Sequence, residues 1–284
     1  MPQQSKAVLI SNRRVGSYHH LVLTAEGIAD GVRPGHFAAI AVGGPQTSMI
    51  LRRAFSIHRA TAMTSQGPTL ELIVSAHGAG TEWLVAQSTG AIIDVVSPLG
   101  KPFALPVSPA SCLLVAGGYG SAPMTYLGEE LIARGCNVDI VFGASTESKL
   151  FGALEAKRIA RYFEVTTDDG STGTKGRVSD VMPQLMDKAN TEVVYACGPM
   201  QMLKSVSKLS SQRGVVSQCA VEESMACGIG VCMTCVLPVI GDDGVTRMLR
   251  SCVEGPVFRG DSVRWDDIGT VPVDCLGAPE LGGH

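Results

Sequence analysis

The sequence lacks a long apolar run, a concentration of basic residues and the even number of cysteines that a full set of disulfides needs. No apolar run reaches the length of about 18 residues that a bilayer-spanning helix needs, so no transmembrane span is expected. The stretch MPQQSKAVLISNRR lacks the charged-then-apolar pattern of a secretory signal, so a cytoplasmic location is expected. The formal net charge is −3 and the basic residues are scattered, which argues against nucleic acid as the principal partner.

Charged residues make up 17% of the chain, below the usual level of about 25%. Either a partner covers part of the surface, or a compact glycine-rich protein needs less charge. Hydrophobic residues make up 45% of the 284 positions, a globular composition with enough material for two modest domains or one large one.

The chain from about residue 7 to 103 consists of short segments rich in apolar or β-branched residues, with Gly, Pro or polar clusters between them. Examples are VLTAEG, HFAAIAV, RAFSIHR, LELIVSAH and AIIDVVSPLG. Several such segments at close spacing predict a small antiparallel β-barrel.

From about residue 110 to 213 the pattern changes to strands alternating with helices. CLLVAGG is a continuous apolar run typical of a buried parallel strand, and APMTYLGEELIARG follows with helical spacing. NVDIVFGAS, FEVTTDDG and EVVYACG repeat the strand pattern before the helix MQMLKSVSKLSSQRG. This alternation predicts a parallel α/β sheet. The predicted division is residues 1–105, 106–214 and 215–284.

Nine cysteines are present, and four of them fall between residues 227 and 252. Cys227, Cys232 and Cys235 have the spacing C-x4-C-x2-C, and Cys252 follows after sixteen residues. This spacing is typical of a plant-type 2Fe-2S cluster. Gly228 and Gly230 allow a tight loop that brings backbone N–H groups toward the sulfurs.

Two other interpretations of these cysteines stay open at this point. A structural zinc site usually takes its ligands as two close pairs, whereas here three cysteines crowd together and one is remote. The four could also be unrelated buried thiols. Cys219 lies outside the spacing, and Cys112, Cys136 and Cys275 are expected to be packing residues.

Two small-residue turns follow strands of the α/β region. Gly117-Gly118-Tyr119-Gly120-Ser121-Ala122-Pro123 leads from CLLVA into a helix, and Cys197-Gly198-Pro199 ends the strand VVYA. Small residues let a backbone approach a pyrophosphate, and the carboxyl ends of such strands form the usual ligand crevice. The first turn departs from G-x-G-x-x-G at Pro123, and an ordinary tight turn is the alternative.

Two features of the first region could bind a phosphate. In Arg53-Ala54-Phe55-Ser56 a strand offers a guanidinium and a hydroxyl, and Thr81 in HGAGT could cap a following helix. Taken alone, such features are more often a solvated edge arginine and a plain helix cap.

These motifs occur in an order that resembles the ferredoxin-reductase superfamily, in which a flavin-binding barrel precedes a pyridine-dinucleotide domain. ESMACGIGVCMTC, with SCVEGPVF carrying the last cysteine, looks like the electron-transfer subunits of NAD-linked dihydroorotate dehydrogenases. The resemblance covers nearly the whole chain. One departure is Ala54, where the superfamily often has Pro.

The resemblance implies a role for each motif. It implies FAD contacts from the strand and turn residues Arg53, Ala54, Phe55, Ser56, Ile73, Val74, Ser75, Gly80 and Thr81. It implies NAD contacts from Gly117, Gly118, Gly120, Ala122, Pro123, Cys197, Gly198 and Pro199, and it implies a 2Fe-2S cluster on the four clustered cysteines. NVDIVFGASTES offers no arginine cluster for a 2′-phosphate, which leaves NAD against NADP open.

The resemblance also implies a partner, an FMN-containing subunit that oxidises dihydroorotate in pyrimidine biosynthesis, in a heterotetramer of two subunit types. Electrons would pass through the cluster and FAD to NAD⁺. The alternatives are a subunit of another flavin/iron–sulfur reductase, serving ferredoxin:NADP or sulfur chemistry, and a zinc-stabilised scaffold without redox activity.

Overall fold

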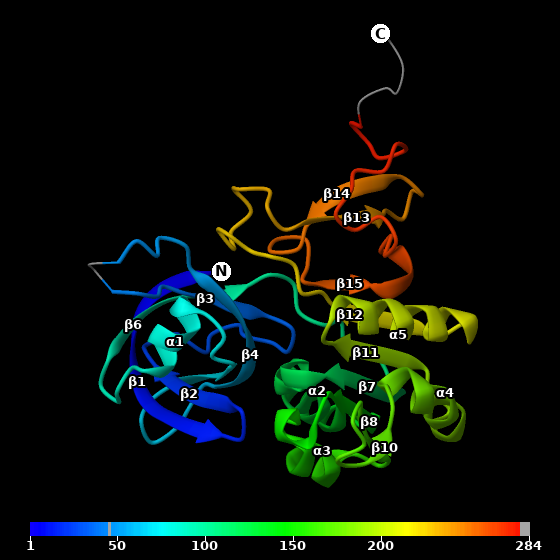
Figure 1. The fold of residues 1–284 in the computed structure, drawn as a ribbon, viewed down its shortest axis with the longest axis horizontal. Coiled ribbons are helices and arrows are strands. Elements are labelled where there is room, and N and C mark those ends of the chain that lie inside the picture. The colour runs from blue at the N-terminus through cyan, green and yellow to red at the C-terminus, as the bar shows by residue number, and fades with distance from the viewer. Residues whose placement is uncertain (45–46, 279–284) are drawn as a thin grey trace.

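The computed structural model describes residues 1–44 and 47–278, which form a barrel, an α/β sheet and a C-terminal region beside both (Figure 1). Six antiparallel strands close the barrel in the order β1-β2-β5-β4-β3-β6. They are β1 (Gln3–Val15), β2 (Tyr18–Thr24), β3 (Phe37–Ile40), β4 (Arg53–Thr61), β5 (Thr69–Val74) and β6 (Ile92–Leu99), and α1 (Ala79–Val85) precedes β6. Inward aliphatic side chains such as Leu9, Leu21 and Leu72 fill the interior. The predicted barrel is confirmed.

Seven strands form the second sheet in the order β10-β9-β8-β7-β11-β12-β15. They are β7 (Ser111–Gly117), β8 (Asn137–Ala144), β9 (Phe163–Thr167), β10 (Thr174–Lys175), β11 (Val193–Cys197), β12 (Val216–Ala220) and β15 (Val257–Arg259). All neighbours are parallel except β12 and β15. The predicted parallel α/β sheet is confirmed.

Helices cover both faces of this sheet, which explains why its strands are continuously apolar. On one face α2 (Ala122–Ala133) and α3 (Ala153–Ile159) pack over residues such as Leu114 and Ile140. On the other, α4 (Val178–Ala189) and α5 (Met200–Gln212) pack over Leu113 and Val115. Short 3₁₀ turns occur at η1 (Gly118–Ser121), η2 (Glu147–Lys149) and η3 (Gly260–Ser262).

The cysteine-rich segment is inserted between β12 and β15, two strands of the same sheet. It includes a hairpin of β13 (Val236–Ile240) and β14 (Thr246–Arg250). The described part of the tail lies on this hairpin, where the Leu276 N–H donates to the Thr246 carbonyl at 2.8 Å. The sheet therefore extends beyond residue 214, and the division of the chain at that point stays a prediction.

Candidate functional site

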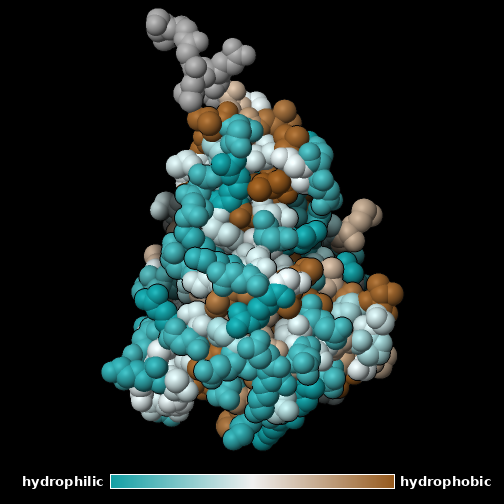
Figure 2. All heavy atoms as spheres, turned by 90° about the vertical axis from the view of Figure 1, so that its right-hand side faces the viewer, coloured by the Kyte–Doolittle hydropathy of each residue, from teal (hydrophilic) through white to brown (hydrophobic). Residues whose placement is uncertain are grey.

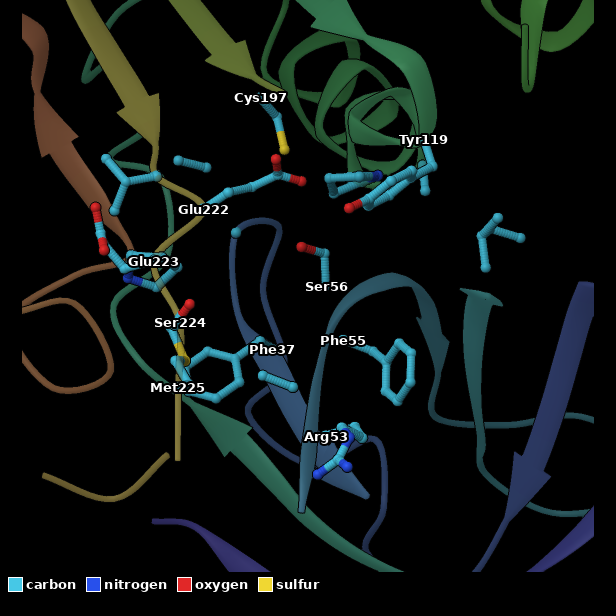
Figure 3. A pocket seen from close by; sticks show the side chains of 18 of the residues that line it. Phe37, Arg53, Phe55, Ser56, Tyr119, Cys197, Glu222, Glu223, Ser224 and Met225 are labelled. Carbon is cyan, nitrogen blue, oxygen red and sulfur yellow. The ribbon is translucent and has the colours of Figure 1, made fainter. Parts of the chain in front are cut away.

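A cavity of about 590 Å³ lies where the barrel, the sheet and the cysteine-rich segment meet (Figure 3). Three walls surround it: β3 and β4 of the barrel, the turn at the start of α2, and the segment that follows β12. Eight of the predicted cofactor-binding residues line it, namely Arg53, Ala54, Phe55, Ser56, Ile73, Ala122, Pro123 and Cys197. Sequence segments far apart in the chain thus contribute to one site.

The barrel wall is set by the pairing of β3 with β4, in which Phe37 faces Ser56 and Ile40 faces Arg53. The Arg53 guanidinium donates to the Leu51 carbonyl at 2.8 Å and lies against Gly80. A Cβ at Gly80 would be 3.0 Å from Arg53 Nε, so glycine leaves the room that the guanidinium occupies. A cation beside the start of α1 suits a phosphate-bearing ligand.

Thr81 does not cap α1 in the way the sequence predicts, because the N-cap residue is Gly78 and Thr81 occupies the third helical position. Its hydroxyl accepts from the backbone N–H groups of His77 and Gly78 at 3.0 and 3.2 Å. The side chain therefore reaches back and binds the donors that an N-cap side chain would leave free. Thr81 is buried and holds the turn in shape.

The two predicted dinucleotide turns press directly against each other. A Cβ at Gly120 would be 2.5 Å from the Cys197 carbonyl oxygen and 2.8 Å from Gly198 Cα. Gly198 has φ +150, and a Cβ there would be 2.9 Å from the Gly117 nitrogen. Only residues without a Cβ permit this approach, so both glycines are required by packing at the carboxyl edge of the sheet.

The remaining predicted residues support the cavity without lining it. They are Val74, Ser75, Gly80, Thr81, Gly117, Gly118, Gly120, Gly198 and Pro199. Val74 ends β5, Ser75 follows it, and Gly118 has φ +56, a value that favours glycine.

Sequence reasoning missed Phe37, Tyr119 and the segment 220–225, which also line the cavity. The strand register explains the segment: Cys197 pairs with Ala220, so the residues after Ala220 leave the sheet beside Cys197. Parallel neighbouring strands end at the same edge, and the prediction of two adjacent strands could have indicated this. Phe37 becomes visible only through its pairing with Ser56.

Glu222 and Glu223 are the acidic residues that line the cavity, and Glu222 points toward Tyr119 and Cys197 (Figure 3). Burial raises the pKa of the Glu222 carboxyl, and the Tyr119 hydroxyl opposes the shift. Burial and the nearby Glu222 raise the pKa of Tyr119 to about 12. Burial also raises the pKa of the Cys197 thiol, so this cysteine stays protonated and is not a nucleophile.

The four clustered cysteines approach one another as two pairs. The Cys227 and Cys232 thiols are near enough to shift each other's pKa, and Cys235 raises the pKa of Cys252, to which Cys227 also contributes. Among the described residues, no three of these sulfurs lie within 4.8 Å of one another. A tetrahedral zinc site, with Zn–S of about 2.3 Å, needs all four sulfurs about 3.8 Å apart. Two pairs fit a two-iron core better than one zinc ion.

The segment from Cys227 to Cys235, the cysteine loop, supplies hydrogen-bond donors to its own sulfurs. The Val231 N–H donates to Cys227 Sγ at 3.3 Å, and the Thr234 hydroxyl donates to Cys232 Sγ at 3.1 Å. The Thr234 hydroxyl and backbone lower the pKa of Cys232 to about 6. Burial opposes ionisation of Cys227, but the backbone N–H groups outweigh it and lower its pKa. These donors suit thiolate ligands.

The loop packs on the barrel at the cavity. Cys235 and Cys252 are buried in one cluster with Phe37, Ala39 and Leu99. A Cβ at Gly228 would be 3.6 Å from the Phe37 ring. Phe37 therefore has the cavity on one side and the cysteine loop on the other.

Two family models match the chain. Residues 222–264 match one described as the iron–sulfur cluster binding domain of dihydroorotate dehydrogenase B, and residues 114–208 match an oxidoreductase NAD-binding domain. The electron transfer subunit of dihydroorotate dehydrogenase B (NAD(+)) from Desulforamulus reducens is 33% identical, over 87% of this chain and 93% of the relative. That of Geobacillus thermodenitrificans is 35% identical, over 92% and 98%.

Solved structures agree with this fold. An NADH-dependent reduced ferredoxin-NADP oxidoreductase superposes with a TM-score of 0.79 and 27% identity, over 93% of this chain and 91% of that one. A flavohemoglobin from Malassezia yamatoensis with bound FAD and heme has a TM-score of 0.59 and 20% identity, over 75% of this chain and 57% of that one, and shares the fold alone.

The barrel, the sheet and the cysteine-rich segment define an FAD/NAD-binding reductase fold with an iron–sulfur-binding domain. Within that class, the chain belongs to the family of electron transfer subunits of NAD-dependent dihydroorotate dehydrogenase B. The resemblance seen in the sequence is confirmed. Among the described residues, no helix combines the length and apolar character needed to cross a membrane.

Proposed function

We propose that this chain passes electrons from an FMN-containing, dihydroorotate-oxidising partner to NAD⁺. The overall reaction is dihydroorotate + NAD⁺ → orotate + NADH + H⁺, which serves UMP synthesis. Bound FAD and a 2Fe-2S cluster would supply the conversion between single electrons and a hydride, which side chains cannot provide. We also propose that the protein acts in the cytoplasm.

One observation carries the proposal: the junction cavity and the cysteine loop share a wall. Phe37 lines the cavity and packs with the buried Cys235 and Cys252. Met225 also lines the cavity and packs against the same group of buried residues as Phe37. A flavin in the cavity would be separated from the iron–sulfur cluster by little more than one layer of side chains.

The barrel residues would hold FAD. Arg53 would pair with the pyrophosphate, because its guanidinium lies beside Gly80 at the start of α1. Ala54, Phe55 and Ser56 line the cavity where the isoalloxazine ring would lie. Ile73 would complete the binding surface as a lining residue. The backbone shaped by Val74, Ser75 and Thr81 would support that surface.

The two turns in contact with each other, residues 117–123 and 197–199, would bind NAD. The first turn, with Gly117, Gly118, Gly120, Ala122 and Pro123, leads into α2, whose N-terminal N–H groups favour an anion. Cys197, Gly198 and Pro199 would lie near the nicotinamide, because Cys197 lines the cavity from the opposite turn. Glu222 would face the same ring and hold or release a proton there, since burial raises its pKa.

The four cysteines would hold the iron–sulfur cluster. The exposed apolar residues around Cys232 favour the binding of a partner protein at this surface. Cys232 is exposed, and its neighbours Ile229, Val231 and Met233 are 56%, 76% and 52% exposed. Three apolar side chains around an exposed ligand suit a surface that a protein partner covers. We infer that the FMN subunit docks here, in a heterotetramer of two subunit types.

Replacement of Cys232 by serine tests the relay. The chain would be coexpressed with its catalytic partner and purified anaerobically, and dihydroorotate-driven NAD⁺ reduction would be measured beside NADH-driven dye reduction. Loss of the first activity with survival of the second is expected, because only the first needs the cluster. Cys136→Ala, a buried change outside the loop, is the matched control and should retain both.

Retention of dihydroorotate:NAD⁺ activity in Cys232→Ser would refute the relay. A visible spectrum of the wild-type complex gives an independent check: flavin bands with a broad iron–sulfur envelope are expected. Colourless protein with stoichiometric zinc would instead support a non-redox scaffold.

A second candidate is a subunit of a ferredoxin:NADP-type reductase, favoured by the likeness to the NADH-dependent reduced ferredoxin-NADP oxidoreductase over 93% of this chain. Copurification separates the two. An FMN-containing partner supports the first proposal, whereas ferredoxin-dependent reduction of NADP⁺ without that partner supports the second.

A further inference from the structure

We propose that His20, His58 and Glu71 form a binding site for a divalent transition-metal ion such as Zn²⁺, on the barrel face that meets α2. The three residues come from the strands β2, β4 and β5, which lie side by side in the barrel. One ligand atom from each lies within 4.8 Å of the others. This site is separate from the cysteine loop, and its test does not depend on the electron-transfer function.

The strand pairing explains why these side chains converge. His20 pairs with Ile73, two residues from Glu71 on the same face of β5. The register of β4 against β5 shifts between Ile57 and Arg59, and His58 is the residue at this irregularity. A bulge re-aims its side chain, and here it turns the buried His58 toward the other two.

The hydrogen bond of His58 leaves one ring nitrogen available for a metal. His58 Nδ1 is 2.5 Å from the carbonyl oxygen of Ala122, the first residue of α2. A carbonyl can only accept, so Nδ1 carries the proton and Nε2 keeps its lone pair. Metal-binding imidazoles typically have this arrangement, in which a bond to a carbonyl fixes the tautomer and the ring orientation.

His20 and Glu71 provide the other two ligands. His20 Nε2 lies 2.7 Å from Glu71 Oε2, so a proton bridges them when no ion is bound. Ligands of a tetrahedral zinc ion lie about 3.3 Å apart, so an ion would displace this proton and separate the two atoms by roughly 0.6 Å. That shift needs only a small side-chain rotation.

The local charge also suits a cation. Burial lowers the pKa of His58, and hydrogen bonding to His20 outweighs burial and lowers the pKa of Glu71. These shifts favour the neutral form of His58 and the carboxylate form of Glu71. The nearby cation, Arg59, is neutralised by a two-bond pair with Glu129 at 2.5 and 2.7 Å.

Two imidazoles and one carboxylate favour Zn²⁺, Co²⁺ or Ni²⁺ over Mg²⁺ or Ca²⁺, with water in the fourth position. A bound ion would polarise the His58 ring and strengthen its bond to Ala122. Ala122 and Pro123 also line the junction cavity. The ion would thus fasten the barrel to the turn that is proposed to receive the dinucleotide.

Zinc titration of the cluster-loaded protein tests the site, because iron then occupies the cysteine loop. Calorimetry with ZnCl₂ should show one equivalent bound, together with a rise in the thermal unfolding temperature. His20→Gln should weaken zinc binding at least about tenfold, since loss of even an outer-shell partner of a metal site typically costs about 10- to 100-fold in affinity. His19→Gln is the matched control, because His19 is adjacent in β2 but bonds to Asn12.

The proposal is overturned if the wild-type protein binds no zinc, or if His20→Gln and His19→Gln bind it equally. Glu71→Gln provides a second variant at a partly exposed position in case His20→Gln fails to fold. MgCl₂ at the same concentrations should give neither heat nor stabilisation, and an equal response to magnesium would also reject the proposal.

Discussion

Replacing Gly120 by alanine should separate the two turns proposed to receive NAD. The added Cβ would lie 2.5 Å from the Cys197 carbonyl oxygen, and its neighbours there are backbone atoms that cannot rotate away. Ordinary van der Waals contact begins at 3.4 Å, so the turns must move apart by roughly 0.9 Å. Overpacking of this kind costs about 1–3 kcal/mol of stability. A misplacement of about 1 Å at a reacting centre costs on the order of 100-fold in rate.

The assay is stopped-flow reduction of the bound flavin by NADH, with thermal unfolding measured in parallel. A 10- to 100-fold fall in the apparent second-order rate is expected from the displacement described above. Gly128→Ala in α2 is the matched control. Its Cβ would lie 2.8 Å from the flexible end of Ile159 and at the ordinary contact distances of 3.5 and 3.7 Å from Leu114 and Val138. Helical alanine is also favoured over glycine by about 1 kcal/mol. An unchanged NADH reaction in a folded Gly120→Ala protein would refute the reasoning.

Three further predictions concern the barrel, the cysteine loop and pH. Arg53→Ala should weaken FAD binding about 10- to 100-fold, because it removes a charge-assisted hydrogen bond. Flavin fluorescence measures this loss. Arg52→Ala is the control: the Arg52 guanidinium pairs with Asp94 at 2.7 Å, so this variant should lose stability but keep FAD. Gly230→Ala should lower iron and sulfide per chain, because Gly230 has φ +83 and its Cβ would lie 2.4 Å from Val253 Cγ2; Gly244→Ala, at φ +76 with open space, should keep its iron. Burial, aided by Arg33, lowers the pKa of His36 to about 4, and its Nδ1 accepts from the Arg33 N–H at 3.0 Å. Protonation of His36 is therefore easier in the unfolded chain, so its contribution to stability is constant above about pH 6.5 and falls as the pH drops toward 4. His36→Gln should lose less stability than wild type between pH 7 and 5 in urea unfolding, and equal losses would contradict this account.

Local sequence patterns predicted the two architectures because each is written in short-range periodicity. Alternating apolar segments with turn residues define the barrel strands, and continuous apolar runs such as CLLVA define strands covered by helices on both faces. The four clustered cysteines were also identifiable, because their spacing within one loop is a property of the chain itself.

The hydroxyl of Thr81 shows where local reasoning fails. A threonine before a helical stretch is a good N-cap candidate, but the position of the helix start depends on where the chain leaves β5 and on what packs above Gly80. The helix begins one turn earlier, and the side chain reaches back to the His77 and Gly78 N–H groups.

The sequence by itself determined the strand pattern, the cysteine spacing and the glycine turns, since each depends on neighbours within a few residues. Only the tertiary structure decided that Phe37 separates the cavity from the cysteine loop, that Glu222 faces Cys197, and that His20, His58 and Glu71 meet. These contacts depend on strand register and on the packing of the barrel against the sheet. Such long-range pairings are fixed by the burial of whole faces, and no single segment of the sequence encodes them.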